Sequence, residues 1–204
     1  MLSSGTTPST KPGHPLETLA ELFFYAAAGA FLWMHLRPIS RSLLRKPTAS
    51  DVRAILIGIV ALFLVRVATA VQLVATHQTK HVQSGFEHFD VVTRLPLVTA
   101  LGIVLTVIVS VIVGPVVEEI AFRGLLFGAL APRLGVLAGA LVSALVFGAI
   151  HGDLVLFPTL AALGFVAAIA YAATRNLLVP ITLHMLNNAV GALVLVNSSL
   201  HHHR

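Results

Sequence analysis

Three ionisable side chains, Glu118, Glu119 and Arg123, lie inside a long and mainly apolar stretch that runs from Pro96 to about Leu130. A charge in the middle of a bilayer costs a few kcal/mol even on insertion scales. Such residues therefore pair with one another, line a water-filled cavity or take part in chemistry. The stretch predicts a functional site at membrane depth.

The composition of the whole chain supports a membrane location. Of 204 residues, 57% are hydrophobic and only 10% are charged, whereas a soluble domain is about 45–50% apolar and about a quarter charged. So apolar a chain has too little polar surface to cover a soluble fold. It also has no cysteine, which excludes disulfides, thiolate metal sites and a cysteine nucleophile. We therefore expect a polytopic membrane protein.

The net charge of +5 indicates how the protein is oriented in the membrane rather than binding to nucleic acid. Basic residues gather in one connection between two apolar segments: Arg37, Arg41, Arg45, Lys46 and Arg53. Positive loops remain in the cytoplasm, so we expect this connection there, with Arg133 and Arg175 on the same side. The termini and the loop from Thr76 to Arg94 would lie outside. We expect a lipid bilayer and no nucleic acid among the partners.

Six segments are long enough to approach the about 20 apolar residues that a membrane helix needs. They are Leu16 to Leu36, Val52 to Ala75, Pro96 to about Leu130, Gly135 to Ile150, Leu154 to Thr174, and Leu177 to Val196. The expected organisation is a disordered tail (1–15), two accessory spans with an outer loop (16–94), a membrane core (95–197) and a short tail (198–204). The fold class is all-α, a polytopic bundle of about six transmembrane helices.

The third segment is too long for one straight span, and Gly114-Pro115 predicts how it fits. Proline removes an amide donor and clashes with the preceding turn, so a helix kinks there. Opened backbone at membrane depth is tolerated only where protein or a wet cavity covers it. Because Glu118 follows directly, we expect a kinked third helix beside a conical polar cavity in the membrane.

The first motif separates two adjacent carboxylates. Glu119 and Arg123 are four residues apart and stack on one helical face as an ion pair. Glu118 points about 100° away from Glu119, which leaves it free for chemistry. The alternative is an ion cluster that only stabilises the helix, but this leaves the second carboxylate unexplained.

Two further motifs lie in later segments. Phe147 and His151 form one pair four residues apart, and His184 and Asn188 form another. A lone histidine near a span end is also typical of an interface, and Asn and His often supply interhelical hydrogen bonds. Together, however, a free carboxylate, a histidine and a His/Asn donor pair are what amide hydrolysis requires: a base for water and donors for the oxyanion.

Three sequence patterns resemble the three motifs of the CPBP family. They are Glu118-Glu119-x-x-x-Arg123, Phe147-x-x-x-His151 and His184-x-x-x-Asn188. This family comprises membrane-embedded CAAX-processing endopeptidases and bacteriocin-processing or Abi proteins. The resemblance covers about Pro96 to Val196.

The resemblance implies a role for each motif residue. Glu118 and His151 would activate the attacking water, while His184 and Asn188 would form the oxyanion hole. Glu119 and Arg123 would support Glu118, with Phe147 completing the second motif. The family is often labelled metalloprotease, and we expect no cofactor. Zinc is the alternative, with Glu118, His151 and His184 as the ligand set because zinc takes about three protein ligands.

Other functions stay open beside an intramembrane endopeptidase. They are a zinc-dependent version of that protease, a catalytically idle immunity or scaffold protein of the same fold, and a proton-coupled transporter. The substrate would be a peptide or a membrane-protein segment, and we expect the bacterial cytoplasmic membrane. Arg66, in the second span, would snorkel outward, pair with Glu21 or line the substrate path.

Overall fold

The computed structural model describes residues 23, 25–30, 34, 45–78, 104–105 and 107–202, with side chains up to residue 193. Within these ranges every regular element is helical, so the fold is all-α as expected. The first expected span lies largely outside the described residues, as do most of the outer loop and Glu21.

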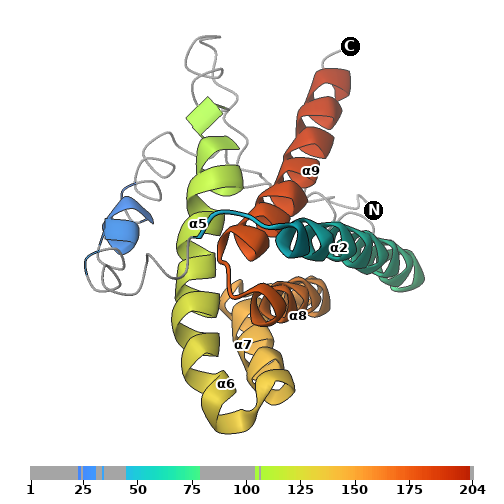
Figure 1. Ribbon diagram of the computed structural model, residues 1–204. Helices are drawn as coiled ribbons and strands as arrows, with labels where there is room; N and C mark the ends of the chain where they lie inside the picture. The colour runs from blue at the N-terminus through green and yellow to red at the C-terminus, as the bar shows by residue number, and fades with distance from the viewer. Residues whose placement is uncertain are drawn as a thin grey trace, which may run out of the picture.

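The centre of the molecule is one helix that continues without interruption from residue 107 to 134. Figure 1 shows it in green to yellow as the longest upright element. Its winding changes along its length, through η2 (Val109–Val113), α5 (Gly114–Glu119), η3 (Ile120–Phe127) and α6 (Gly128–Leu134), where η denotes a π-helix. At Pro115 the structure thus shows a change of winding between two π-helical segments, and the expected kink angle stays a prediction.

Two antiparallel neighbours, α7 (Val136–Ile150) and α8 (Phe157–Thr174), follow the central helix. Small residues let them approach closely: a Cβ at Gly148 would lie 3.1 Å from the Ala161 amide nitrogen, and one at Gly164 would lie 3.1 Å from the Ala144 Cα. This is how membrane helices gain van der Waals contact without a hydrophobic driving force between them.

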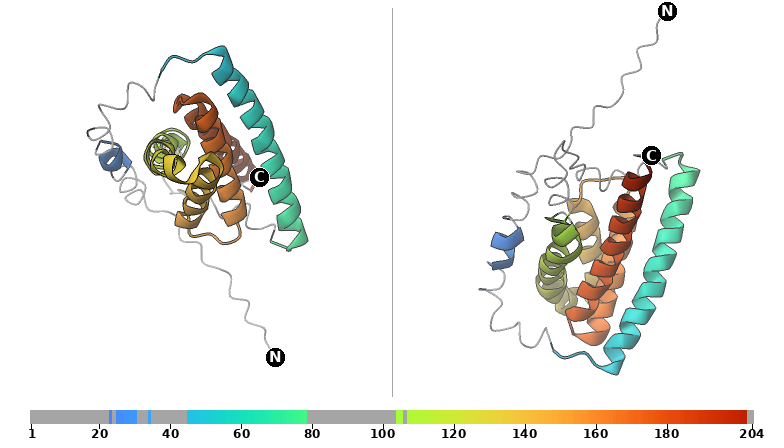
Figure 2. Two further views of the ribbon diagram at one scale, coloured as in Figure 1. Left: turned by 60° about the horizontal axis from the view of Figure 1, so that its bottom comes forward. Right: turned by 90° about the horizontal axis from the view of Figure 1, so that it is seen from above.

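Helix α2 (Ala49–Ala75) runs along the outer side of α8 and α9 in both views of Figure 2. Helix α9 (Leu178–His202) begins among the other helices and extends past the expected end of the last span. Among the described helices, α2 and α8 are long and apolar enough to cross a membrane. The shorter α7 and the segment Leu178–Leu193 are also apolar, and the full count of six spans remains a prediction.

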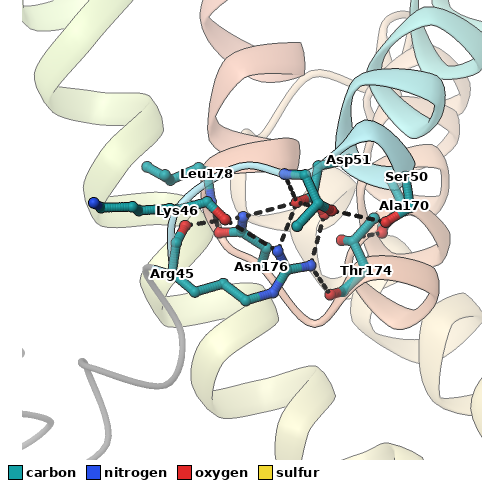
Figure 3. Close-up of polar contacts among 9 residues, drawn as sticks. Arg45, Lys46, Ser50, Asp51, Ala170, Thr174, Asn176 and Leu178 are labelled. Atoms are coloured by element: carbon teal, nitrogen blue, oxygen red, sulfur yellow. Dashed lines mark hydrogen bonds and ion pairs between the residues drawn. The ribbon is translucent and has the colours of Figure 1, made fainter.

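A polar cluster that we call the clamp fixes the start of α9 (Figure 3). Arg45 donates two hydrogen bonds to Asp51, at 2.7 and 2.8 Å, and one to the Thr174 carbonyl at 2.9 Å. The Asn176 amide donates to Asp51 Oδ2 at 3.5 Å, and its Oδ1 accepts from the Leu178 amide at 3.2 Å. The clamp therefore ties the beginning of α2 to the turn that leads into α9.

Candidate active site

The Glu119–Arg123 ion pair predicted from the four-residue spacing is present on the central helix. Arg123 Nη1 lies 2.9 Å from Glu119 Oε1, and both side chains are buried. Arg123 Nη2 also donates to the Gly164 carbonyl on α8 at 2.8 Å. A buried arginine needs several acceptors, and here they come from its own helix and from a neighbour.

His184, on α9, joins this pair and connects it to Glu118. Its Nδ1 lies 2.9 Å from Glu119 Oε1, the oxygen that also accepts from Arg123. Its Nε2 lies 3.9 Å from Glu118 Oε2, which is too far for a direct hydrogen bond. One imidazole thus stands between two adjacent carboxylates. We call Glu118, Glu119, Arg123 and His184 the carboxylate cluster.

Glu118 is less enclosed than Glu119, with a side chain that is 19% exposed. Its Oε1 accepts a hydrogen bond of 3.2 Å from the Tyr25 hydroxyl. Tyr25 comes from the segment 25–30, drawn in blue, which lies beside the central helix on the side away from α2 (Figure 2). One oxygen of Glu118 is thus held in place by a residue 93 positions away in the chain.

Three polar atoms of the carboxylate cluster are buried without a hydrogen-bond partner in the described part of the chain. They are Glu118 Oε2, Glu119 Oε2 and Arg123 Nε. Buried polar groups are nearly always satisfied in native proteins, and leaving one unpaired costs about 1–3 kcal/mol. Three such atoms in one place distinguish the carboxylate cluster from a fully hydrogen-bonded ion pair.

Phe147 lies at the centre of the three sequence motifs and is fully buried. Its ring centroid is 4.7 Å from that of His151 and 5.7 Å from that of His184. The Arg123 guanidinium carbon lies 4.9 Å from the same ring centroid, within cation–π range. Phe147 therefore packs against a residue of each motif and sets the spacing between them.

His151 ends α7 and is exposed. Its Nδ1 lies 2.7 Å from the Phe147 carbonyl oxygen. A carbonyl only accepts, so Nδ1 carries the hydrogen, and in the neutral ring Nε2 is then a free acceptor. Within the described residues no hydrogen bond or ion pair links His151 to the carboxylate cluster, and the connection runs through the Phe147 ring.

Asn188 lies one turn beyond His184 on α9 but contacts a different element. Its Nδ2 donates to the Ser110 carbonyl of η2 at 2.9 Å. Its Oδ1 accepts from Asn187 Nδ2 at 3.2 Å. The expected pair of donors therefore shares a helix face, but in this structure the two side chains have different partners: carboxylates for His184 and a backbone carbonyl for Asn188.

Sequence reasoning missed two partners of the expected residues. Tyr25 was not singled out, although a tyrosine among apolar residues in a candidate span is itself a signal of a polar partner. The Ser110 carbonyl was missed because a backbone acceptor leaves no trace in a sequence. A π-helical segment changes the hydrogen-bond ladder and is frequent at functional sites, and here it provides this acceptor.

The fit of the alternative zinc ligands can be judged from the same geometry. Among the described residues, no three His, Cys, Asp or Glu side chains form a group that could hold a metal ion. Both ring nitrogens of His184 face the two glutamates, and His151 is separated from them by Phe147. In this arrangement Glu118, His151 and His184 do not form a three-ligand site.

Comparison with known proteins identifies the region that carries these motifs. Residues 98–190 match the family model described as type II CAAX prenyl endopeptidase Rce1-like. No curated protein and no solved structure matches the chain. The matched region includes the central helix from residue 107 onward, α7, α8 and the part of α9 that bears His184 and Asn188. This match supports the resemblance of the region to the CPBP family that the three motifs indicate.

Proposed function

We propose that the protein is an intramembrane endopeptidase in which Glu118 activates a water molecule for attack on a peptide bond. The observation that carries this is the state of Glu118 Oε2, a buried acceptor with no hydrogen-bond partner in the described chain. The other oxygen is fixed by Tyr25. A carboxylate held at one oxygen and unsatisfied at the other is suited to accept a proton from water.

The other motif residues would orient the water molecule and stabilise the oxyanion. His151 Nε2, a free acceptor in the tautomer that the Phe147 carbonyl imposes, would orient the same water. His184 Nε2 and the second hydrogen of Asn188 Nδ2 would donate to the oxyanion. The His184 imidazole also contacts Glu119 Oε1 through Nδ1, at 2.9 Å. Glu119 and Arg123 would hold this imidazole in place.

In the proposed hydrolysis, Glu118 takes up and returns the proton, and no other reactant than water is needed. The water oxygen forms a bond to the carbonyl carbon while its proton passes to Glu118. The tetrahedral intermediate then expels the amine as the carbon–nitrogen bond breaks, and Glu118 returns the proton to the leaving nitrogen. The products are a new carboxylate and a new amine.

The family match suggests a peptide or protein substrate within the membrane. A prenylated CAAX peptide is therefore the first probe, and bacterial peptide leaders or membrane-protein segments are the wider class. We propose a multi-pass protein of the bacterial cytoplasmic membrane.

The test compares the wild type with Glu118→Gln in liposomes that contain a farnesylated CAAX peptide and a set of membrane-anchored peptides. We expect cleavage by the wild type and a loss of roughly 10²–10⁴-fold in the variant, the range for general acid–base catalysis. Cleavage by Glu118→Gln at the wild-type rate would exclude Glu118 as the base. Proton flux without cleavage would favour the transporter instead.

The metal-free form of the proposal has its own test. We expect purified protein to lack stoichiometric zinc and to keep its activity after prolonged treatment with phenanthroline. About one zinc per chain, lost together with activity and restored with it, would establish the zinc-dependent protease.

A further inference from the structure

Arg66 lies in the middle of α2 and reaches the helix that carries two of the candidate site residues. It is half-buried, and its Nη2 donates a hydrogen bond to the backbone carbonyl of Asn187 on α9. An arginine within a membrane helix is costly unless its donors find acceptors. Of the three earlier expectations for Arg66, outward snorkelling does not describe this contact, and the pairing with Glu21 lies outside the described residues.

The contact belongs to a close interface between α2 and α9. Gly58, Leu62 and Arg66 succeed one another at intervals of four residues and so share one face of α2. A Cβ at Gly58 would lie 2.5 Å from Leu183 Cδ1, so a larger residue would require the Leu183 side chain to move. Leu62 and Leu183 lie in the same buried cluster. The face of α9 with Leu183 and Asn187 therefore packs on α2, one residue away from His184 and Asn188.

A short series of hydrogen bonds leads from Arg66 to the Asn188 amide. Arg66 fixes the Asn187 backbone, and the Asn187 side chain donates to Asn188 Oδ1 at 3.2 Å. On its other side Asn188 donates to the Ser110 carbonyl at 2.9 Å. These two contacts fix which end of the amide faces the central helix. One hydrogen of Nδ2 is left to meet a substrate.

We propose that Arg66 is a positioning residue for Asn188, acting through Asn187. The inference rests on the proposed function, in which Asn188 is an oxyanion donor. It assigns a role in the reaction to α2, a helix that lies outside the matched residues 98–190. An oxyanion donor must be held within a few tenths of an ångström, and a displacement of about 1 Å can cost about 10²-fold in rate.

A double-mutant cycle tests this proposal. Arg66→Ala should lower kcat by roughly 10–10²-fold with little change in KM, whereas the same change made in Asn188→Ala should have almost no further effect. Residues that act as a unit are non-additive. Two losses that multiply fully would overturn the proposal, since Arg66 would then act independently of Asn188.

Gln72→Ala is a matched control, because Gln72 also lies on α2 and donates to a backbone carbonyl, that of Val155, at 3.1 Å. It should leave kcat unchanged. Arg66→Lys keeps a donor for the Asn187 carbonyl and should recover part of kcat. If Arg66→Ala does not fold, the cycle is run with Arg66→Gln.

A measurement that does not depend on cleavage separates this inference from the proposed function. The side-chain amide signals of Asn188 in an NMR spectrum, assigned by their absence in Asn188→Ala, should shift in Arg66→Gln and stay in place in Gln72→Ala. Shifted signals in a protein that cleaves no peptide would leave the contact intact and remove the endopeptidase. Unshifted signals in an active protein would remove the positioning role alone.

Discussion

Two clusters of buried charge lie in this apolar bundle, and they differ in how completely their polar atoms are satisfied. In the clamp, Asp51 accepts from Arg45 at both oxygens, and also from Asn176 and from the Thr48 amide and hydroxyl. In the carboxylate cluster, each glutamate has one buried oxygen with no partner among the described residues.

The proposed function assigns stability to the clamp and chemistry to the carboxylate cluster, and the difference in satisfied polar atoms agrees with this assignment. In a cluster whose polar atoms all have partners, the hydrogen bonds offset the free energy that burial of the charges costs. An unsatisfied one keeps that cost, and proteins retain such strain at sites where a ligand or a reaction uses it. Substitutions in the two clusters should therefore separate stability from turnover.

The largest effect should follow the removal of Arg123, the side chain that the carboxylate cluster needs for both stability and turnover. Arg123→Ala removes the arginine partner of the buried Glu119, which costs about 3–5 kcal/mol of unfolding free energy, and turnover should fall as well. Arg123→Lys should recover part of each, because lysine keeps the charge but loses the planar fork. Thermal unfolding in detergent and peptide cleavage measure the two quantities.

Wild-type stability and turnover in Arg123→Ala would show that the ion pair is incidental. The carboxylate cluster would then be no different from a surface pair, and the contrast with the clamp would lose its basis.

The second largest effect concerns two neighbouring asparagines of α9. Asn188→Ala should lower turnover by roughly 10²–10³-fold, as expected for one oxyanion donor, with substrate affinity little changed. Asn187→Ala should be milder, because Asn187 touches Asn188 rather than the substrate. Kinetics of the two variants side by side would decide, and a reversed ranking would move the donor role to Asn187.

The smallest effect on turnover should come from the clamp. Asp51→Asn removes the charge opposite Arg45 and should lower the thermal midpoint by several degrees. Arg45 is 36% exposed and can turn to water, so the loss should stay below that of Arg123→Ala. The cleavage rate per folded molecule should not change. A large drop in that rate would mean that the start of α9 is part of the active geometry.

The sequence was sufficient for the local part of the site. The four-residue spacing of Glu119 and Arg123 predicted their ion pair because helix geometry alone brings such residues together. The other motif residues also lie on helices, as expected, and His151 is the residue directly after α7. The family match over residues 98–190 confirms the resemblance, and the role of each residue stays a prediction.

Long-range contacts could not be predicted in the same way. The Tyr25–Glu118 bond joins residues 93 apart, and the Arg45–Thr174 contact joins residues 129 apart. Such pairs depend on how helices pack, which single-helix periodicity does not contain. The π-helical segments on either side of Gly114–Glu119 were also not predicted, because the proline indicates a kink but not a change of winding.

The most direct test of the account measures stability and cleavage together in Glu118→Gln and Asp51→Asn, reconstituted in the same liposomes. We expect opposite outcomes for the two variants. Glu118→Gln should lose cleavage and unfold at or above the wild-type temperature, because a neutral amide replaces a buried carboxylate with an unsatisfied oxygen. Asp51→Asn should unfold earlier and cleave at the wild-type rate. A Glu118→Gln protein that unfolds early but still cleaves, or an Asp51→Asn protein with wild-type stability and no cleavage, would contradict the account.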